Sequence, residues 1–284
     1  MRLVILIGQR VRSGTNFLGS TLSQHPHIQT IPKESSHGEF NLFRSDSIEN
    51  FYHEASSKSF GINFNDADRL HFYKRIGELW LELLSKKFDL DENKTLFLKT
   101  PIISHYELWL KAFPEAKFIF LCRDGRDNVI SSVKASNLRK RSTPYKAKVI
   151  KSLNHYSGRA FRAHILDWKA TASIFESIEE QKNIKKVKYE DLVDSSENIK
   201  RLLQFLEMDS SEEIIKRCIN APVVGSSFGK NTKGKGSNWI PEKDKSNFKF
   251  VNKWSKWGAF KRKYFKLLAG KELIKLGYEK DTNW

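Results

Sequence analysis

The chain has 284 residues, of which 39% are hydrophobic, 12% aromatic and 29% charged. These proportions are typical of a soluble globular protein and exclude a disordered or fibrous chain. Because no linker interrupts the sequence, we expect a single domain over residues 1–284. Lys and Arg number 50 against 33 Asp and Glu, and the formal net charge of +17 suits an acidic ligand, an acidic polymer or an anionic membrane surface.

The cysteines and the N-terminal sequence indicate a compartment. Cys122 and Cys218 are too few for a disulfide framework, which favours a reducing environment. The opening Met1 to Gly8 is too short for a signal peptide, and no stretch reaches the roughly 18 apolar residues of a spanning helix. We therefore expect a cytoplasmic protein without a membrane span. The histidines lack ligand spacing with the cysteines, so no metal site is expected.

Strands and helices alternate in the predicted secondary structure. Apolar runs predict buried strands at Leu3 to Ile7, Thr95 to Leu98 and Lys117 to Cys122, and a fourth strand is expected at Ile184 to Val187, before the Tyr-Glu-Asp segment. Apolar residues recur at helical spacing after Ser13, after Gly125 and over residues 70–88, 104–113, 160–178, 199–206 and 260–276. This order predicts an α/β fold with a mostly parallel sheet covered by helices on both faces.

Two irregular segments lie between these elements. Residues 223–253 are rich in Gly, Ser, Asn and Lys and are too long for a passive connector, so we expect a functional or disordered loop there. Residues 37–66 carry scattered aromatic side chains, and we expect them to face the substrate.

The loop over residues 8–16 follows a strand and opens a helix, a position where backbone N–H groups and the helix dipole bind anions. It is not the P-loop of nucleotide triphosphatases, because its two glycines are spaced one residue too far apart and no Lys follows the second. It resembles the 5′-phosphosulfate loop of sulfotransferases that use 3′-phosphoadenosine 5′-phosphosulfate (PAPS). The resemblance implies cofactor contacts at Arg12, Ser13, Gly14, Thr15 and Asn16, although the family usually has Thr at the last position.

A second motif follows the strand over residues 117–122. It reads Arg-Asp-Gly-Arg-Asp from Arg123 and continues into a helix that contains Ser131. This order resembles the 3′-phosphate segment of the same family, which implies that Arg123 and Ser131 bind that phosphate. An Arg at a strand end and a Ser on the next helix can hold one phosphate together. A surface cluster of Arg and Asp ion pairs would fit the charges but not the apolar strand.

Further matches follow in the family's order. The Tyr-Glu-Asp segment at residues 189–191 resembles one whose Tyr lies near the adenine of the cofactor. The Lys-Gly-x-x-Ser-Asn-Trp segment at residues 233–239 resembles a loop that closes over the 3′-phosphate, and Thr precedes it where the family has Arg. The matches run from about residue 2 to about residue 279. The resemblance implies cofactor contacts at Tyr189, Thr232, Lys233 and Gly234.

The resemblance also implies catalytic residues. Arg12 and Lys99, the latter at a strand end, would stabilise the charge that develops during transfer. The cytosolic branch uses a His two residues after this Lys as the base, but Pro101 stands there and accepts no proton. The tyrosylprotein and heparan-type branches use a Glu one helix and one strand after the first loop, and Glu34 matches that position. The alternatives for the base are His37, Glu39 and His105.

The implied function is transfer of a sulfuryl group from PAPS to a hydroxyl or amine, with release of 3′-phosphoadenosine 5′-phosphate (PAP). Since neither a transmembrane anchor nor a disulfide set accompanies the motifs, we expect a small-molecule acceptor. A protein tyrosine or a glycan is the alternative acceptor, because the Glu base resembles the branches that act on those substrates. A nucleotide kinase is disfavoured by the first loop. A polyanion-binding module remains as the non-enzyme alternative because of the net charge and the basic aromatic stretch over residues 254–264. A sulfotransferase needs no nucleic-acid partner.

Overall fold

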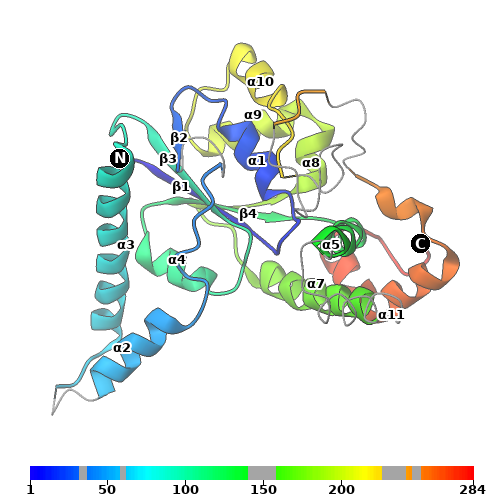
Figure 1. The fold of residues 1–284 in the computed structure, drawn as a ribbon, viewed down its shortest axis with the longest axis horizontal. Helices are drawn as coiled ribbons and strands as arrows, with labels where there is room; N and C mark the ends of the chain where they lie inside the picture. Colours follow the sequence, from blue (N-terminus) through cyan, green and yellow to red (C-terminus); the bar gives the residue numbers. More distant parts are fainter. Residues whose placement is uncertain (32–36, 58–61, 140–157, 226–240, 245–250) are drawn as a thin grey trace.

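A five-stranded sheet lies at the centre of the fold (Figure 1). The structure is a computed structural model that describes residues 1–31, 37–57, 62–139, 158–225, 241–244 and 251–284. The strand order is β2-β3-β1-β4-β5, and every neighbouring pair is parallel. This confirms the predicted parallel sheet. The strands are β1 (Leu3–Gly8), β2 (Ile28–Thr30), β3 (Thr95–Thr100), β4 (Lys117–Cys122) and β5 (Ile184–Lys188).

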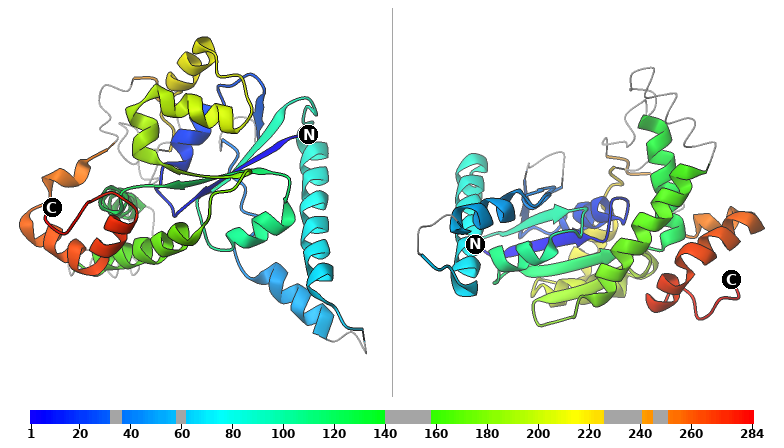
Figure 2. Two further views of the ribbon diagram at one scale, coloured as in Figure 1. Left: turned by 180° about the vertical axis from the view of Figure 1, so that it is seen from behind. Right: turned by 90° about the horizontal axis from the view of Figure 1, so that it is seen from below.

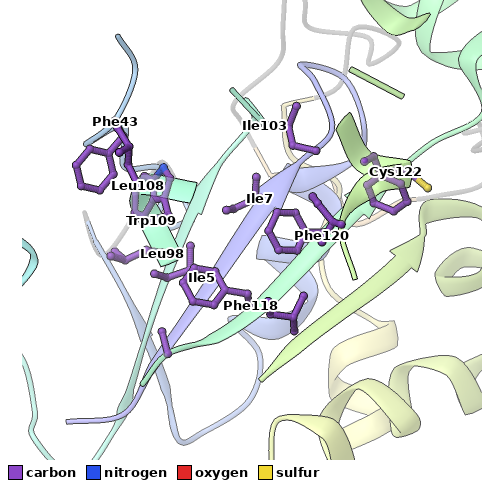
Figure 3. Packing of buried hydrophobic residues seen from close by; sticks show 14 of the residues in the cluster. Ile5, Ile7, Phe43, Leu98, Ile103, Leu108, Trp109, Phe118, Phe120 and Cys122 are labelled. Carbon is purple, nitrogen blue, oxygen red and sulfur yellow. The ribbon is translucent and has the colours of Figure 1, made fainter. Parts of the chain in front are cut away.

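Both faces of the sheet are buried, which explains the continuous apolar runs. Successive side chains of a strand point to opposite faces. Ile5 and Ile7 of β1 therefore belong to one core cluster, whereas Val4 and Leu6 belong to another. Figure 3 shows the first cluster, in which side chains of β1, β3 and β4 lie beside Trp109 of α4 (Tyr106–Ala112).

Helices cover both faces of the sheet, as predicted (Figures 1 and 2). One face packs against α1 (Thr15–Leu22), α8 (Tyr189–Asp194), α9 (Ser196–Phe205) and α10 (Glu212–Ile219). The other packs against α4, α5 (Gly125–Arg139), α7 (Arg159–Ser177) and α11 (Ala259–Lys275). The long helix α3 (Asp66–Phe88) packs on α4, near α2 (Ser47–Ser57). None of the described helices is both long and apolar enough to span a membrane.

The sheet has a switch point between β1 and β4. After β1 the chain enters α1 on one face and continues to β2, whereas after β4 it enters α5 on the other face and continues to β5. The loops that leave these two neighbouring strands therefore diverge. In open parallel sheets this divergence creates the crevice in which ligands bind, at the carboxyl ends of the strands.

Candidate active site

The loop between β1 and α1 contains two residues with left-handed backbone, Arg12 at φ 73° and Gly14 at φ 103°. A Cβ on Gly14 would lie 2.3 Å from Cδ2 of Tyr189, so only glycine fits there. The hydroxyl of Ser13 accepts a hydrogen bond of 3.2 Å from the backbone N–H of Arg10, which closes the turn. Helix α1 therefore begins at the carboxyl edge of the sheet, where its N-terminus favours an anion.

Lys99 lies near the end of β3, and 0% of it is exposed. Its Nζ donates to Oδ1 of Asn16 at 2.7 Å and to Oε2 of Glu39 at 3.1 Å. The segment around Glu39 runs alongside β3, because the N–H of Lys99 donates to the carbonyl of Gly38 and the N–H of Phe40 to that of Lys99. Burial lowers the pKa of Lys99, and the carboxylate of Glu39 opposes this.

The side chain of Arg12 extends toward α5. Its Nε donates to the hydroxyl of Ser131 at 3.1 Å, and its Nη1 donates to the carbonyl of Gly225 at 3.1 Å. Arg123, which follows β4, donates from Nη1 to the carbonyl of Arg12 at 3.3 Å. Residues that the family resemblance assigns to the 5′ and 3′ ends of one ligand are therefore direct neighbours at the switch point.

The ring of Tyr189 lies close to Arg12 and Arg123. The guanidinium of Arg123 lies 4.4 Å from the centre of the Tyr189 ring, a cation–π contact. The ring also packs edge-on against Phe17 at 5.3 Å and directly against Gly14. Burial raises the pKa of Tyr189 to about 12, so the phenol stays neutral beside the arginines.

The next residue, Glu190, ties the end of β5 to α5. Its carboxylate accepts hydrogen bonds from the backbone N–H of Asp124 at 3.1 Å and from the hydroxyl of Tyr278 at 3.2 Å. Burial, which outweighs the attraction of Arg123, raises the pKa of Glu190 to about 7.

Arg10, in the first loop, is a buried residue that sequence reasoning did not single out. It is 5% exposed, and its Nη1 donates to Oδ1 of Asn128 at 2.6 Å. Its Nη2 forms an ion pair with Asp167 and lies 3.3 Å from Nδ1 of His164. Asn128 in turn donates to the carbonyl of Val11 at 3.2 Å. These contacts fix the first loop to α5 and α7. Both helices lie more than 100 residues further along the chain, so no local sequence pattern indicates the contacts.

The acidic residues of the Arg-Asp-Gly-Arg-Asp motif are buried, not surface ion pairs. Asp124 binds Arg126 at 2.6 Å, and the two residues are 6% and 2% exposed. Arg126 also pairs with Glu279 and lies 3.6 Å from the ring centre of Trp254. The carboxylate of Asp127 accepts two backbone hydrogen bonds from the start of the 3₁₀-helix η2 (Lys253–Lys256).

The predicted base and part of the predicted cofactor site lie outside the described residues, namely Glu34, Thr232, Lys233 and Gly234. Two alternatives for the base lie beside Lys99. Glu39 pairs with it. His37 also lies close, since both His37 and Lys99 pack against Gly19, and burial and then the charge of Lys99 lower the pKa of His37. His105 instead lies 3.2 Å from Asp46.

Sequence comparison identifies the class of protein to which this site belongs. Residues 4–212 match the model of the sulfotransferase family, so the chain belongs to that family and is a sulfotransferase. A search among curated proteins finds no match.

Solved structures share the fold. Mouse sulfotransferase SULT7A1, crystallised with PAP, aligns with a TM-score of 0.51 and 12% identity over 96% of this chain and 84% of that chain. The sulfotransferase domain of the Synechococcus PCC 7002 olefin synthase aligns with a TM-score of 0.51 and 15% identity, over 98% of this chain and 95% of that chain. The sulfotransferase domain of the curacin biosynthetic pathway aligns with a TM-score of 0.50 and 14% identity, over 98% of this chain and 99% of that chain. At these identities the likeness concerns the fold.

Proposed function

We propose that this sulfotransferase takes its sulfuryl group from PAPS and transfers it to a hydroxyl or amine of a small molecule. The observation that carries the proposal is the convergence of Arg12, Lys99 and Arg123 from three neighbouring strand ends on the start of α1. Such a set suits a ligand with two separate anionic groups. PAPS has a phosphosulfate at its 5′ end and a phosphate at its 3′ position.

The chemistry and shape of the donors fit PAPS. Arg123 and Ser131 offer guanidinium and hydroxyl donors for the 3′-phosphate, and the first loop and α1 offer backbone N–H groups for the 5′-phosphosulfate. Gly14 leaves the backbone uncovered, because a side chain there would collide with Tyr189. The PAP bound by the mouse sulfotransferase supports the same ligand class for this chain.

Lys99 stabilises the transfer electrostatically, and Arg12, whose side chain donates to Ser131 in this structure, adds its positive charge from the first loop. The acceptor oxygen or nitrogen forms a bond to sulfur while the bond from sulfur to the 5′-phosphate oxygen breaks, and negative charge develops on the leaving phosphate. Positive groups held in a dry site act strongly on such charge. Lys99 meets this condition because it is fully buried and oriented by Asn16 and Glu39.

Glu34 is the proposed general base, which takes the proton of the acceptor as the new bond to sulfur forms. Glu39 suits this role less well. Its carboxylate already accepts a hydrogen bond from the ammonium of Lys99 at 3.1 Å, so it is engaged in holding that side chain. Glu39 therefore serves to orient Lys99.

The acceptor approaches along the segment that starts at His37. Residues 38–40 run beside Lys99, which supports the expectation that this region faces the substrate. The ammonium of Lys99 lies below the surface, so an acceptor must present a protruding hydroxyl or amine. Small phenols, alcohols and amines meet this requirement.

The proposal is tested by screening the protein with sulfur-labelled PAPS against phenols, alcohols, amines, tyrosine peptides and oligosaccharides. We expect label on at least one small phenol, alcohol or amine. Label on peptides or oligosaccharides alone would contradict the proposed acceptor class while leaving the donor intact. Absence of transfer to every class would contradict the proposal as a whole.

A further inference from the structure

The start of η2 is fixed firmly to the first turn of α5. Oδ1 of Asp127 accepts hydrogen bonds from the backbone N–H groups of Lys253 at 2.7 Å and Trp254 at 3.0 Å. The carboxylate that makes them is fully buried. The guanidinium of Arg126 contacts the rings of both Trp254, at 3.6 Å, and Trp284, at 4.6 Å. The backbone of Lys253 is therefore held against the first turn of α5.

That place adjoins the proposed 3′-phosphate site. Asp127 and Ser131 are four residues apart on α5, so they lie on the same side of the helix, and Lys134 follows three residues later. Ser131 is the residue whose hydroxyl binds Arg12. The charges that act on the ammonium of Lys253 include Arg123, Asp127, Lys134 and Arg12, which come from the first loop, the end of β4 and α5.

This concentration of positive charge has an energetic cost. Lys253 is partly buried, and burial together with its cationic neighbours lowers its pKa to about 7. The nearby carboxylate of Asp127 already accepts two backbone N–H groups. Cations that are brought together with loss of hydration are typical of a site that a multiply charged anion completes.

We propose that Lys253 is a direct ligand of the 3′-phosphate of PAPS and PAP, in one site with Arg123 and Ser131. This inference rests on the proposed function. The sequence motifs do not include Lys253, because it lies beyond the loop segment that resembles the family's 3′-phosphate loop. Asp127 is a positioning residue, because its two hydrogen bonds to the backbone of η2 hold Lys253 beside the site.

The test compares PAP with AMP, which differs only by lacking the 3′-phosphate. Calorimetric titration of Lys253→Met should show PAP affinity lowered about 10- to 100-fold, the loss of one charge-assisted bond, with AMP affinity changed less than about twofold. Lys253→Arg should retain most of the PAP affinity. Lys256→Met, at an exposed position of the same 3₁₀-helix, should behave as wild type.

A second readout separates a ligand from a structural residue. Because a bound phosphate favours the charged ammonium, PAP binding to wild type at pH 8 should take up close to one proton, and Lys253→Met should abolish that uptake. Titrations in buffers of different ionisation enthalpy measure it. Unchanged PAP affinity in Lys253→Met, or equal losses for PAP and AMP, would overturn the inference and leave the proposed function standing. Failure of wild type itself to prefer PAP over AMP would overturn both.

Discussion

The ammonium of Lys99 lies 2.7 Å from the side-chain oxygen of Asn16, which joins the end of β3 to the first turn of α1. The family resemblance leads one to expect Thr at position 16. The longer Asn side chain carries a carbonyl oxygen, a good acceptor for an ammonium. The departure from the family pattern thus coincides with a direct contact to the proposed catalytic lysine.

Asn16→Ala should destabilise the protein, because the fully buried ammonium of Lys99 loses a hydrogen bond. A bond to a charged group contributes about 1.5–3 kcal/mol, and urea unfolding should show a loss of that size. Asn93→Ala, at an exposed position, is the control. Equal stabilities for the two variants would show that Asn16 does not support Lys99.

Gly14→Ala should disrupt the first loop. The new Cβ would lie 2.3 Å from Tyr189 on a backbone with φ 103°, so steric overlap adds to backbone strain. We expect a loss of at least about 2 kcal/mol in the free energy of unfolding. Gly258→Ala is the control, since its surroundings are open and its φ is −70°, and it should cost at most about 1 kcal/mol as a poorer helix cap. A mild effect of Gly14→Ala would contradict the close packing of the loop on Tyr189.

Glu190 should make stability depend on pH. Its pKa is about 7 in the folded protein and ordinarily 4.5, so the folded state binds more protons between these values and stability falls as pH rises through them. Glu190→Gln removes this dependence. The variant should match wild type near pH 5 and exceed it by up to about 3 kcal/mol at pH 8. Denaturant titrations at both pH values measure the difference, and a difference that does not change with pH would refute the raised pKa.

Glu34→Gln should lower turnover strongly while leaving PAP affinity nearly unchanged, because it removes only the proton-accepting charge. The expected loss is about 10²–10⁴-fold with an alcohol. A more acidic phenol needs less help from a base, so it should rescue Glu34→Gln more than Lys99→Ala, which lacks charge stabilisation. Glu92→Gln, at an exposed position, is the control. Near-native turnover of Glu34→Gln with an alcohol would show that Glu34 is not the base, and His37 and Glu39 would then be the candidates.

The sequence predicted β1, β3 and β4 because they carry apolar runs that are buried on both faces, and it placed β5, which is mostly only partly buried, before the Tyr-Glu-Asp segment. The three-residue strand β2 is too short to show such a pattern. The family resemblance assigned Lys99 and Arg123 to the same ligand as the first loop, which agrees with the meeting of parallel strand ends at one edge of the sheet. The sequence could not reveal the roles of Arg10 and Asp127, whose partners in α7 and η2 lie far along the chain.

The central claim is that the site binds a nucleotide with a phosphate at its 3′ position. Thermal unfolding with PAP and with AMP tests it most directly, with Arg123→Ala as the matched variant. PAP at 100 times its dissociation constant should stabilise wild type by about 2.7 kcal/mol, and AMP at the same concentration should stabilise it much less. Arg123→Ala should lose most of the preference for PAP. Equal stabilisation of wild type by PAP and AMP, or none by either, would contradict the claim.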